Sequence, residues 1–125
     1  MLLRKGLGSN VRRMASITSN VSYDTVAREW RCKWSGDAEK ASLVALQDQL
    51  KAFESKIKSV KGVKKVQRIV CGGCLDFKVI TSLDAASFGA WAEGGFSPEA
   101  EVLEAWKKIP NVTSVETQTY TIMDV

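Results

Sequence analysis

Apolar residues recur at alternating spacings of three and four between residues 37 and 62, the most regular hydrophobic pattern in the chain. That spacing places them on one stripe of an α-helix. Asp37 can cap the start of this helix by accepting hydrogen bonds from free backbone N–H groups, and Gly62 can end it in the left-handed conformation. We therefore predict one long amphipathic helix, whose apolar stripe is formed by Leu43, Leu46, Leu50, Phe53, Ile57 and Val60.

An alternating pattern over residues 26–34 predicts a half-buried strand before this helix. One face of the strand carries Trp30, Cys32 and Trp34, and the other carries charged side chains. Because Cys32 lies between two tryptophans, we expect it in the hydrophobic core.

Two further strands are predicted at residues 63–71 and 74–83, on either side of Gly72-Gly73. This dipeptide suits the positive φ angles of a tight hairpin turn. The residues facing the helix are then expected to pair as Val70 with Leu75, Arg68 with Phe77, and Val66 with Val79. Arg68 is the polar exception among them, and its long stem can reach the edge of the sheet.

A second helical segment follows, and glycines break it in two. Asp84 is predicted to cap its start, and Gly94-Gly95 interrupts it. Ser97 and Pro98 are predicted to restart the helix, because they are favoured residue types at the cap and first-turn positions.

Residues 112–122 predict a last strand that is polar on both faces, which is typical of an edge strand or of one that meets a partner. The resulting order is β-α-β-β-α-β, with a broken second helix. Right-handed crossovers place both helices on one face of a four-stranded antiparallel sheet. This order resembles the ferredoxin-like sandwich over residues 24–123, so we expect an α+β fold with one open sheet face.

Residues 1–22 are basic and contain no acidic side chain, and their four basic residues account for the whole net charge of +4. Such a serine-rich basic segment is typical of a mitochondrial presequence, with a disordered basic tail as the alternative. We expect residues 1–22 to form a leader or extension and residues 23–125 a single domain. The expected location is mitochondrial, on the matrix side or at the inner membrane, with no transmembrane span.

The residue types used in familiar catalytic sites are sparse. The chain has no histidine and three cysteines. The commonest general base near neutral pH is therefore missing, and a four-cysteine iron–sulfur cluster is excluded. No nucleophile–base pair, phosphate loop or complete metal site is recognisable. We therefore expect no catalytic residue, no cofactor and no bound metal, and we predict that the protein is not an enzyme.

Cys71 and Cys74 form a C-x-x-C spacing across the predicted hairpin turn. Both sulfurs would lie on the same side, with Cα atoms about 5.5 Å apart. This makes them a candidate redox pair. Two inert thiols at a turn, or half of a zinc site completed by another chain, are the alternatives.

A run of basic residues begins in the second half of the long helix and continues into the next strand. These residues are candidates for contact with anionic lipid headgroups or a partner subunit, with a solvated helix face as the alternative. Nucleic acid is a poor candidate, because residues 23–125 are formally neutral. The run consists of Lys51, Lys56, Lys58, Lys61, Lys64, Lys65 and Arg68.

The small ferredoxin-like body, the leader and the polar last strand resemble accessory subunits of mitochondrial complexes in divergent protists, in particular those of the mitochondrial ATP synthase. The resemblance implies a non-catalytic structural subunit of a large inner-membrane complex, which binds other protein subunits through its open sheet face and edge strand. Two alternatives are a mitochondrial ribosomal protein and a small dimeric ligand-binding or redox module that uses Cys71 and Cys74.

Overall fold

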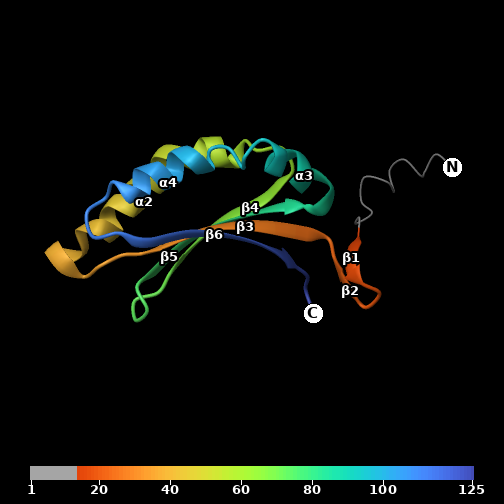
Figure 1. Cartoon of the computed structure of the whole chain (residues 1–125), viewed down its shortest axis with the longest axis horizontal. Helices are drawn as coiled ribbons and strands as arrows, with labels where there is room; N and C mark the ends of the chain where they lie inside the picture. Colours follow the sequence, from red (N-terminus) through yellow and green to blue (C-terminus); the bar gives the residue numbers. More distant parts are fainter. Residues whose placement is uncertain (1–13) are drawn as a thin grey trace.

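The computed structural model describes residues 14–125 and has the ferredoxin-like α+β fold. A four-stranded antiparallel sheet has the order β4-β5-β3-β6, and the helices cover one of its faces (Figure 1). The sheet elements are β3 (Thr25–Lys33), β4 (Val63–Val70), β5 (Asp76–Asp84) and β6 (Thr113–Ile122), and the helices are α2 (Asp37–Lys58), α3 (Ala85–Glu93) and α4 (Glu99–Lys107). The predicted fold class, the broken second helix and the position of β6 at an edge are confirmed.

The hydrophobic core lies between the sheet and the helices. Leu46 and Ile57 of α2 are 0% and 1% exposed, and the other four residues of the predicted stripe pack partly buried against the same cluster. From the sheet, Trp30, Phe77 and other apolar residues meet them. The predicted amphipathic helix is confirmed, because a stripe of this period can be buried only against a second apolar layer.

The start of α2 differs from the prediction. No side chain caps this helix start, so the predicted capping role of Asp37 is wrong. The Ser35 hydroxyl instead accepts from the backbone N–H of Asp37 at 3.0 Å, and the Ser42 hydroxyl accepts from that of Ser35 at 2.9 Å. The first residues of the helix, 38–40, adopt left-handed backbone angles, so the helix axis is kinked at its entry. Serine hydroxyls can close such turns by accepting from a backbone N–H group two residues further on, as aspartate does.

The register of the β4–β5 hairpin is shifted by two residues from the prediction. Val70 pairs with Phe77 rather than with Leu75. The backbone N–H of Cys71 donates to the carbonyl of Asp76 at 3.0 Å, so the turn spans residues 72–75 rather than Gly72-Gly73 alone. A shift of two residues leaves every side chain on its predicted face. Arg68 therefore still faces α2, where it donates to the Gln47 side chain at 2.7 Å.

The two halves of the broken second helix begin differently. The Asp84 side chain accepts from the backbone N–H of Ser87 at 3.1 Å, which confirms it as the cap of α3. In α4 the cap position is held by Pro98 with no side-chain hydrogen bond, so the predicted cap role of Ser97 is wrong. The Ser97-Pro98 peptide bond is cis.

A small hairpin precedes the sheet and overlaps the end of the segment predicted as a leader. It consists of β1 (Ala15–Thr18) and β2 (Val21–Tyr23) and stands at one end of the sheet (Figure 1). These two strands were not predicted, because segments this short carry no clear alternation. Residues 1–13, with most of the predicted presequence, lie outside the described residues, so the presequence stays a prediction. Within residues 14–125, no helix is long and apolar enough to cross a membrane.

Candidate functional site

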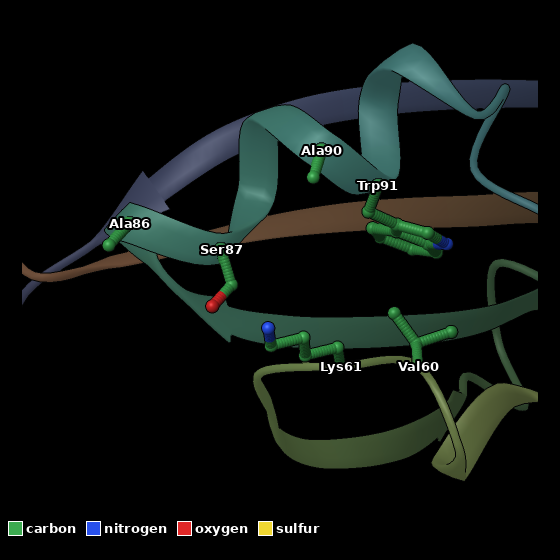
Figure 2. A pocket seen from close by; sticks show the side chains of 6 residues that line it. All are labelled: Val60, Lys61, Ala86, Ser87, Ala90 and Trp91. Carbon is green, nitrogen blue, oxygen red and sulfur yellow. The ribbon is translucent and has the colours of Figure 1, made fainter.

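A groove of about 400 Å³ runs between α3 and the loop that joins α2 to β4, and we call it the α3 groove. Val60 and Lys61 extend from the loop toward the side chains of α3 (Figure 2). Its wall is mainly apolar, with a hydroxyl and an ammonium group at the rim. Helix α3 contributes Ala86, Ser87, Ala90 and Trp91. Pockets of about 300–1,000 Å³ with a few convergent polar groups are typical of small-molecule sites.

The loop side of the groove is fixed by close contact with the start of α3. Gly62 has a φ of +90°, and a side chain at this position would collide with that of Ser87. The Gly62 carbonyl accepts from the backbone N–H of Asp84 at 3.2 Å. The Ser87 hydroxyl donates to Asp84, whose two carboxylate oxygens lie 3.1 and 3.0 Å away. Helix α2 ends at Lys58 with Ser59 at its cap position, so the prediction that Gly62 ends this helix is wrong. Gly62 instead lets the loop approach α3.

Trp91, which lines the groove, belongs to an aromatic cluster. Trp91 is 8% exposed, and its indole N–H donates to the Ser97 carbonyl at 2.9 Å. Its ring meets Phe96 edge-on at 5.1 Å and Phe88 edge-on at 5.8 Å between centroids. These near-perpendicular contacts and the indole hydrogen bond fix the orientation of the Trp91 ring beside the groove.

An ion pair between Arg28 of β3 and Glu99 of α4 lies beside this aromatic cluster. The Arg28 guanidinium lies 4.0 Å from the Phe96 centroid and donates to the Glu99 carboxylate at 2.8 and 3.2 Å. Glu99 also accepts from the Trp30 indole at 2.7 Å. Both side chains of the pair are 15% exposed. Glu99 thereby joins the first turn of α4 to the centre of the sheet.

The open face of the sheet carries a second polar network, centred on Glu29. Glu29 is 3% exposed although no helix covers it, and it accepts from Tyr120 at 2.8 Å and from Arg31 at 3.0 Å. Burial and the hydrogen bond to Glu29 raise the pKa of Tyr120. The carboxylates of Glu29 and Glu116 raise the pKa of Arg31. Arg31 thus pairs with both carboxylates within the face.

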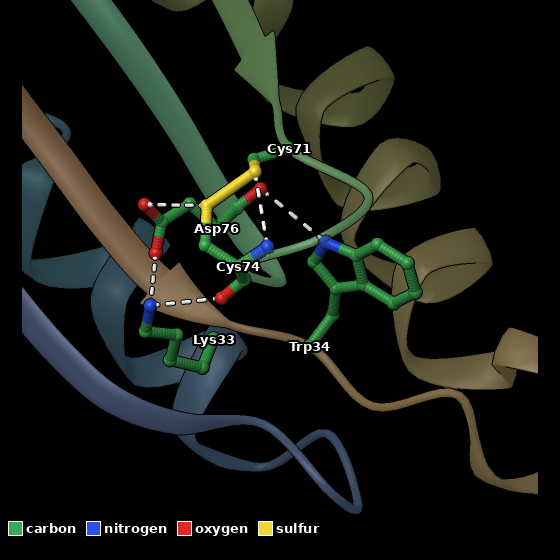
Figure 3. The surroundings of a disulfide bond; sticks show 5 residues. All are labelled: Lys33, Trp34, Cys71, Cys74 and Asp76. Carbon is green, nitrogen blue, oxygen red and sulfur yellow. Dashed lines mark hydrogen bonds and ion pairs between the residues drawn. A yellow bond between two sulfur atoms is a disulfide. The ribbon is translucent and has the colours of Figure 1, made fainter.

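The structure joins Cys71 and Cys74 in a disulfide with a Cα–Cα distance of 5.6 Å (Figure 3). Beside them, Lys33 forms an ion pair with Asp76 at 2.6 Å, which lowers the pKa of that carboxyl. A redox role for the pair stays a prediction. Cys32 is 2% exposed as expected, and burial raises its pKa to about 12. Among residues 14–125, no cluster of three or more side chains suited to holding a metal is found.

The basic residues singled out in the sequence do not share one surface. Lys61 lines the α3 groove, and Arg68 faces α2. Lys64 donates to Thr25 at 2.6 Å, and Lys65 lines a depression that also includes Ser82. The other three lie on α2, where Lys56 reaches Glu101 at 3.5 Å, Lys58 reaches Glu54 at 2.7 Å, and Lys51 is exposed. Contact with lipid or a partner stays a prediction for all seven.

The fold is shared with small proteins of known structure. The monooxygenase of the ActVA-Orf6 gene of Streptomyces coelicolor, solved with nanaomycin D, is 15% identical over 82% of this chain and 90% of that chain, with a TM-score of 0.61. SnoaB, a cofactor-independent oxygenase from Streptomyces nogalater, is 17% identical over 82% and 96%, with a TM-score of 0.54. A dimeric protein of ferredoxin-like fold from Bacteroides fragilis is 15% identical over 78% and 96%, with a TM-score of 0.55. No family model and no curated protein sequence matches the chain.

These comparisons correct the functional prediction. Two of these structural neighbours are described as oxygenases and one as a dimeric protein, and none of the three is described as a subunit of an ATP synthase or another mitochondrial complex. The predicted non-catalytic scaffold of such a complex is therefore wrong, and so is the prediction that the protein is not an enzyme. The alternative of a small dimeric ligand-binding module fits better. The order of helices and strands could not distinguish a scaffold from an enzyme, because one fold can serve both functions. The mitochondrial location is a separate prediction and stays one.

Three residues of the site went unnoticed in the sequence. The alternation of β3 places Arg28 on the side of the strand that faces the helices. A charged residue at a position where the pattern expects an apolar one indicates a buried partner. Its partner Glu99 lies 71 positions further along the chain, and no local pattern connects two residues so far apart. Ser87 carries no sequence signal, because its role depends on the close approach of Gly62.

Proposed function

We propose that this protein binds a small, mainly apolar molecule that carries an anionic or polar oxygen, and that it does so in the α3 groove. The α3 groove is the observation that carries the proposal. Its aromatic and alanine wall suits a flat apolar body, and the Lys61 ammonium at the rim suits a negatively charged oxygen. The Ser87 hydroxyl, already donating to Asp84, can accept a hydrogen bond from the same ligand.

Oxygenation of the bound molecule is the reaction that we propose to test first. Two structural neighbours are described as a monooxygenase and a cofactor-independent oxygenase, and one of them was solved with a small organic ligand. In the groove, Trp91 and the alanines would keep water from one side of the ligand, and Lys61 would favour an ionised oxygen on it. Oxygen consumption with candidate ligands, with and without added flavin and nicotinamide, measures this reaction.

Ligand binding can be measured before the natural ligand is known. Anilinonaphthalene sulfonate is a suitable probe, because it joins flat apolar rings to an anionic group, and nanaomycin D is a second. We expect Ala90→Phe to weaken binding of either probe by about tenfold or more, roughly 1.4 kcal/mol, because the new ring fills the groove. Lys61→Gln should weaken binding of the sulfonate by about fivefold, since an exposed ion pair contributes up to ~1 kcal/mol.

Matched variants on the exposed side of α2 separate this site from general surface binding. Ala52→Phe adds the same ring and Lys51→Gln removes the same charge away from the groove. Both are expected to bind the probes like the wild type. Equal losses in the groove variants and the α2 variants would remove the groove from the proposal.

We propose a homodimer that forms through the open sheet face. No helix covers this face (Figure 1), and one structural neighbour is described as dimeric. Arg31 pairs there with both Glu29 and Glu116, and Lys33 pairs with Asp76, so a second copy could cover these charges without leaving them unpaired. Ile122, which is 38% exposed on this face, would lie in the contact.

Light scattering after size exclusion tests the dimer. We expect the wild type to elute as a dimer and Ile122→Glu as a monomer, because the new carboxylate would be buried in the contact without a partner. Val44→Glu, at an exposed apolar position of α2, is the matched control and should remain dimeric. A wild-type monomer, or a dimer that survives Ile122→Glu, would contradict this interface.

A further inference from the structure

The Cys71–Cys74 disulfide lies at an accessible turn. Gly72, Gly73 and Cys74 are exposed, and Cys71 is half-buried. The turn is at the opposite end of β5 from α3, roughly 25 Å away along a nine-residue strand. A dissolved thiol can therefore reach these sulfurs without passing the α3 groove, and chemistry at the turn is independent of ligand binding there.

The hairpin is held by hydrogen bonds that do not involve the disulfide. The backbone N–H of Cys71 donates to the Asp76 carbonyl at 3.0 Å, and that of Trp34 donates to the Leu75 carbonyl at 2.9 Å. The Trp34 indole reaches the Asp76 carbonyl at 3.3 Å, and Lys33 reaches the Cys74 carbonyl at 2.9 Å. Because these contacts close the turn from the backbone, the sulfurs should stay close together when the disulfide is reduced.

The two sulfurs have different surroundings. The Cys71 sulfur accepts the backbone N–H of Cys74 at 3.0 Å, and such a donor favours a thiolate on Cys71. The Cys74 sulfur lies 3.3 Å from an Asp76 carboxylate oxygen, which disfavours a thiolate and can accept the proton of a thiol. The other Asp76 oxygen is held by Lys33 (Figure 3), so the carboxylate is fixed in this position.

From this asymmetry we infer that the hairpin is a thiol–disulfide exchange site for a low-molecular-weight thiol, with Cys74 as the sulfur that is attacked and Cys71 as the leaving and resolving sulfur. The incoming thiolate forms a bond to the Cys74 sulfur while the Cys71–Cys74 bond breaks, and Cys71 leaves as the stabilised thiolate. A second thiolate then attacks the small-molecule sulfur of the mixed disulfide. This step releases the external disulfide and leaves Cys74 to take a proton beside Asp76. Two external thiols are oxidised to one disulfide, and the protein disulfide is reduced to a dithiol.

The first test is an equilibrium titration of the wild-type chain. The protein is equilibrated in mixtures of glutathione and glutathione disulfide, alkylated with N-ethylmaleimide and analysed by intact mass. We expect two labels to appear together as the reduced fraction rises, with an unchanged circular dichroism spectrum. Cys32 serves as the internal control, because its burial should block labelling until denaturant is added. Labelling of the pair only in denaturant, or loss of the fold on reduction, would overturn the inference.

The second test addresses the difference between the sulfurs. Iodoacetamide should alkylate Cys71 in the Cys74→Ser protein about threefold or more faster than Cys74 in the Cys71→Ser protein, because thiolate is the reactive form. Adding Asp76→Asn to the Cys71→Ser protein should speed alkylation of Cys74, whereas the distant Asp124→Asn should not. Equal rates for the two cysteines, or no effect of Asp76→Asn, would contradict the assigned roles.

Discussion

The two faces of strand β3 are stabilised by different interactions. Toward the helices, Trp30 and Cys32 are 1% and 2% exposed and belong to the apolar core. Toward the open side, Glu29 and Arg31 are held by hydrogen bonds and ion pairs to side chains of β6. One strand with a period of two therefore separates a layer that depends on apolar burial from a layer that depends on charge.

This difference separates the source of stability from the surface that is free to bind. Apolar burial is completed within one chain and does not depend on the ionisation of any group. The polar network depends on pH, and it leaves a flat face available to a second copy. The helix side also holds the α3 groove, so the proposed ligand and the proposed partner would use opposite faces.

The largest expected effect is on the core side. Phe77 is fully buried and meets Trp106 edge-on at 5.6 Å. Phe77→Ala should lower the free energy of unfolding by about 3–5 kcal/mol, because it leaves a cavity. On the open face, Ile69→Ala at a position 45% exposed should cost less than about 1 kcal/mol. Urea unfolding measures both, and similar losses would mean that the two faces do not differ in this way.

The second-largest expected effect concerns the Arg28–Glu99 ion pair, which lies on the helix side of the sheet. Glu99→Gln keeps the shape of the side chain but leaves the Arg28 guanidinium without its carboxylate. We expect a loss of about 2 kcal/mol in urea unfolding, since a poorly solvated charge loses its partner. Glu101→Gln in the same helix breaks only an exposed 3.5 Å pair with Lys56 and should change stability by less than about 0.5 kcal/mol. A loss for Glu99→Gln no larger than for Glu101→Gln would show that the network does not join α4 to the sheet.

The smallest expected effect tests whether the contribution of the open face to stability depends on pH. Tyr120→Phe should cost about 1 kcal/mol at neutral pH, through its lost hydrogen bond to Glu29. In the folded protein, burial and the hydrogen bond to Glu29 raise the pKa of Tyr120. Above about pH 10 the unfolded chain therefore loses this proton while the folded chain keeps it, and stability falls as the pH rises. Unfolding curves from about pH 8 to about pH 11 should fall more steeply for the wild type than for Tyr120→Phe. Parallel slopes would contradict the coupling.

Much of the fold could be predicted from local patterns. The spacing of Leu46 and Ile57 is enough to bury both on one side of α2, and the alternation around Trp30 assigns the faces of β3. Asp84 caps α3 as its residue type suggests. The start of α2 was less predictable, because Asp37 and Ser35 can both close the turn, and the contact with Ser42 favours the serine.

The site was less predictable than the fold. The basic residues look continuous along the chain, but the structure divides them between α2, the α3 groove and the open face. The function suggested by leader, element order and edge strand was wrong, because those features describe how the chain folds and say little about what it binds.

The chain by itself determined which side of each helix and strand is apolar, because that pattern repeats within a few residues. The tertiary structure decided the hairpin register, the pairing of Arg28 with Glu99 and the approach of Gly62 to Ser87. Each of these joins segments that are separate in sequence, so it depends on how all the layers pack together and not on the residues beside it.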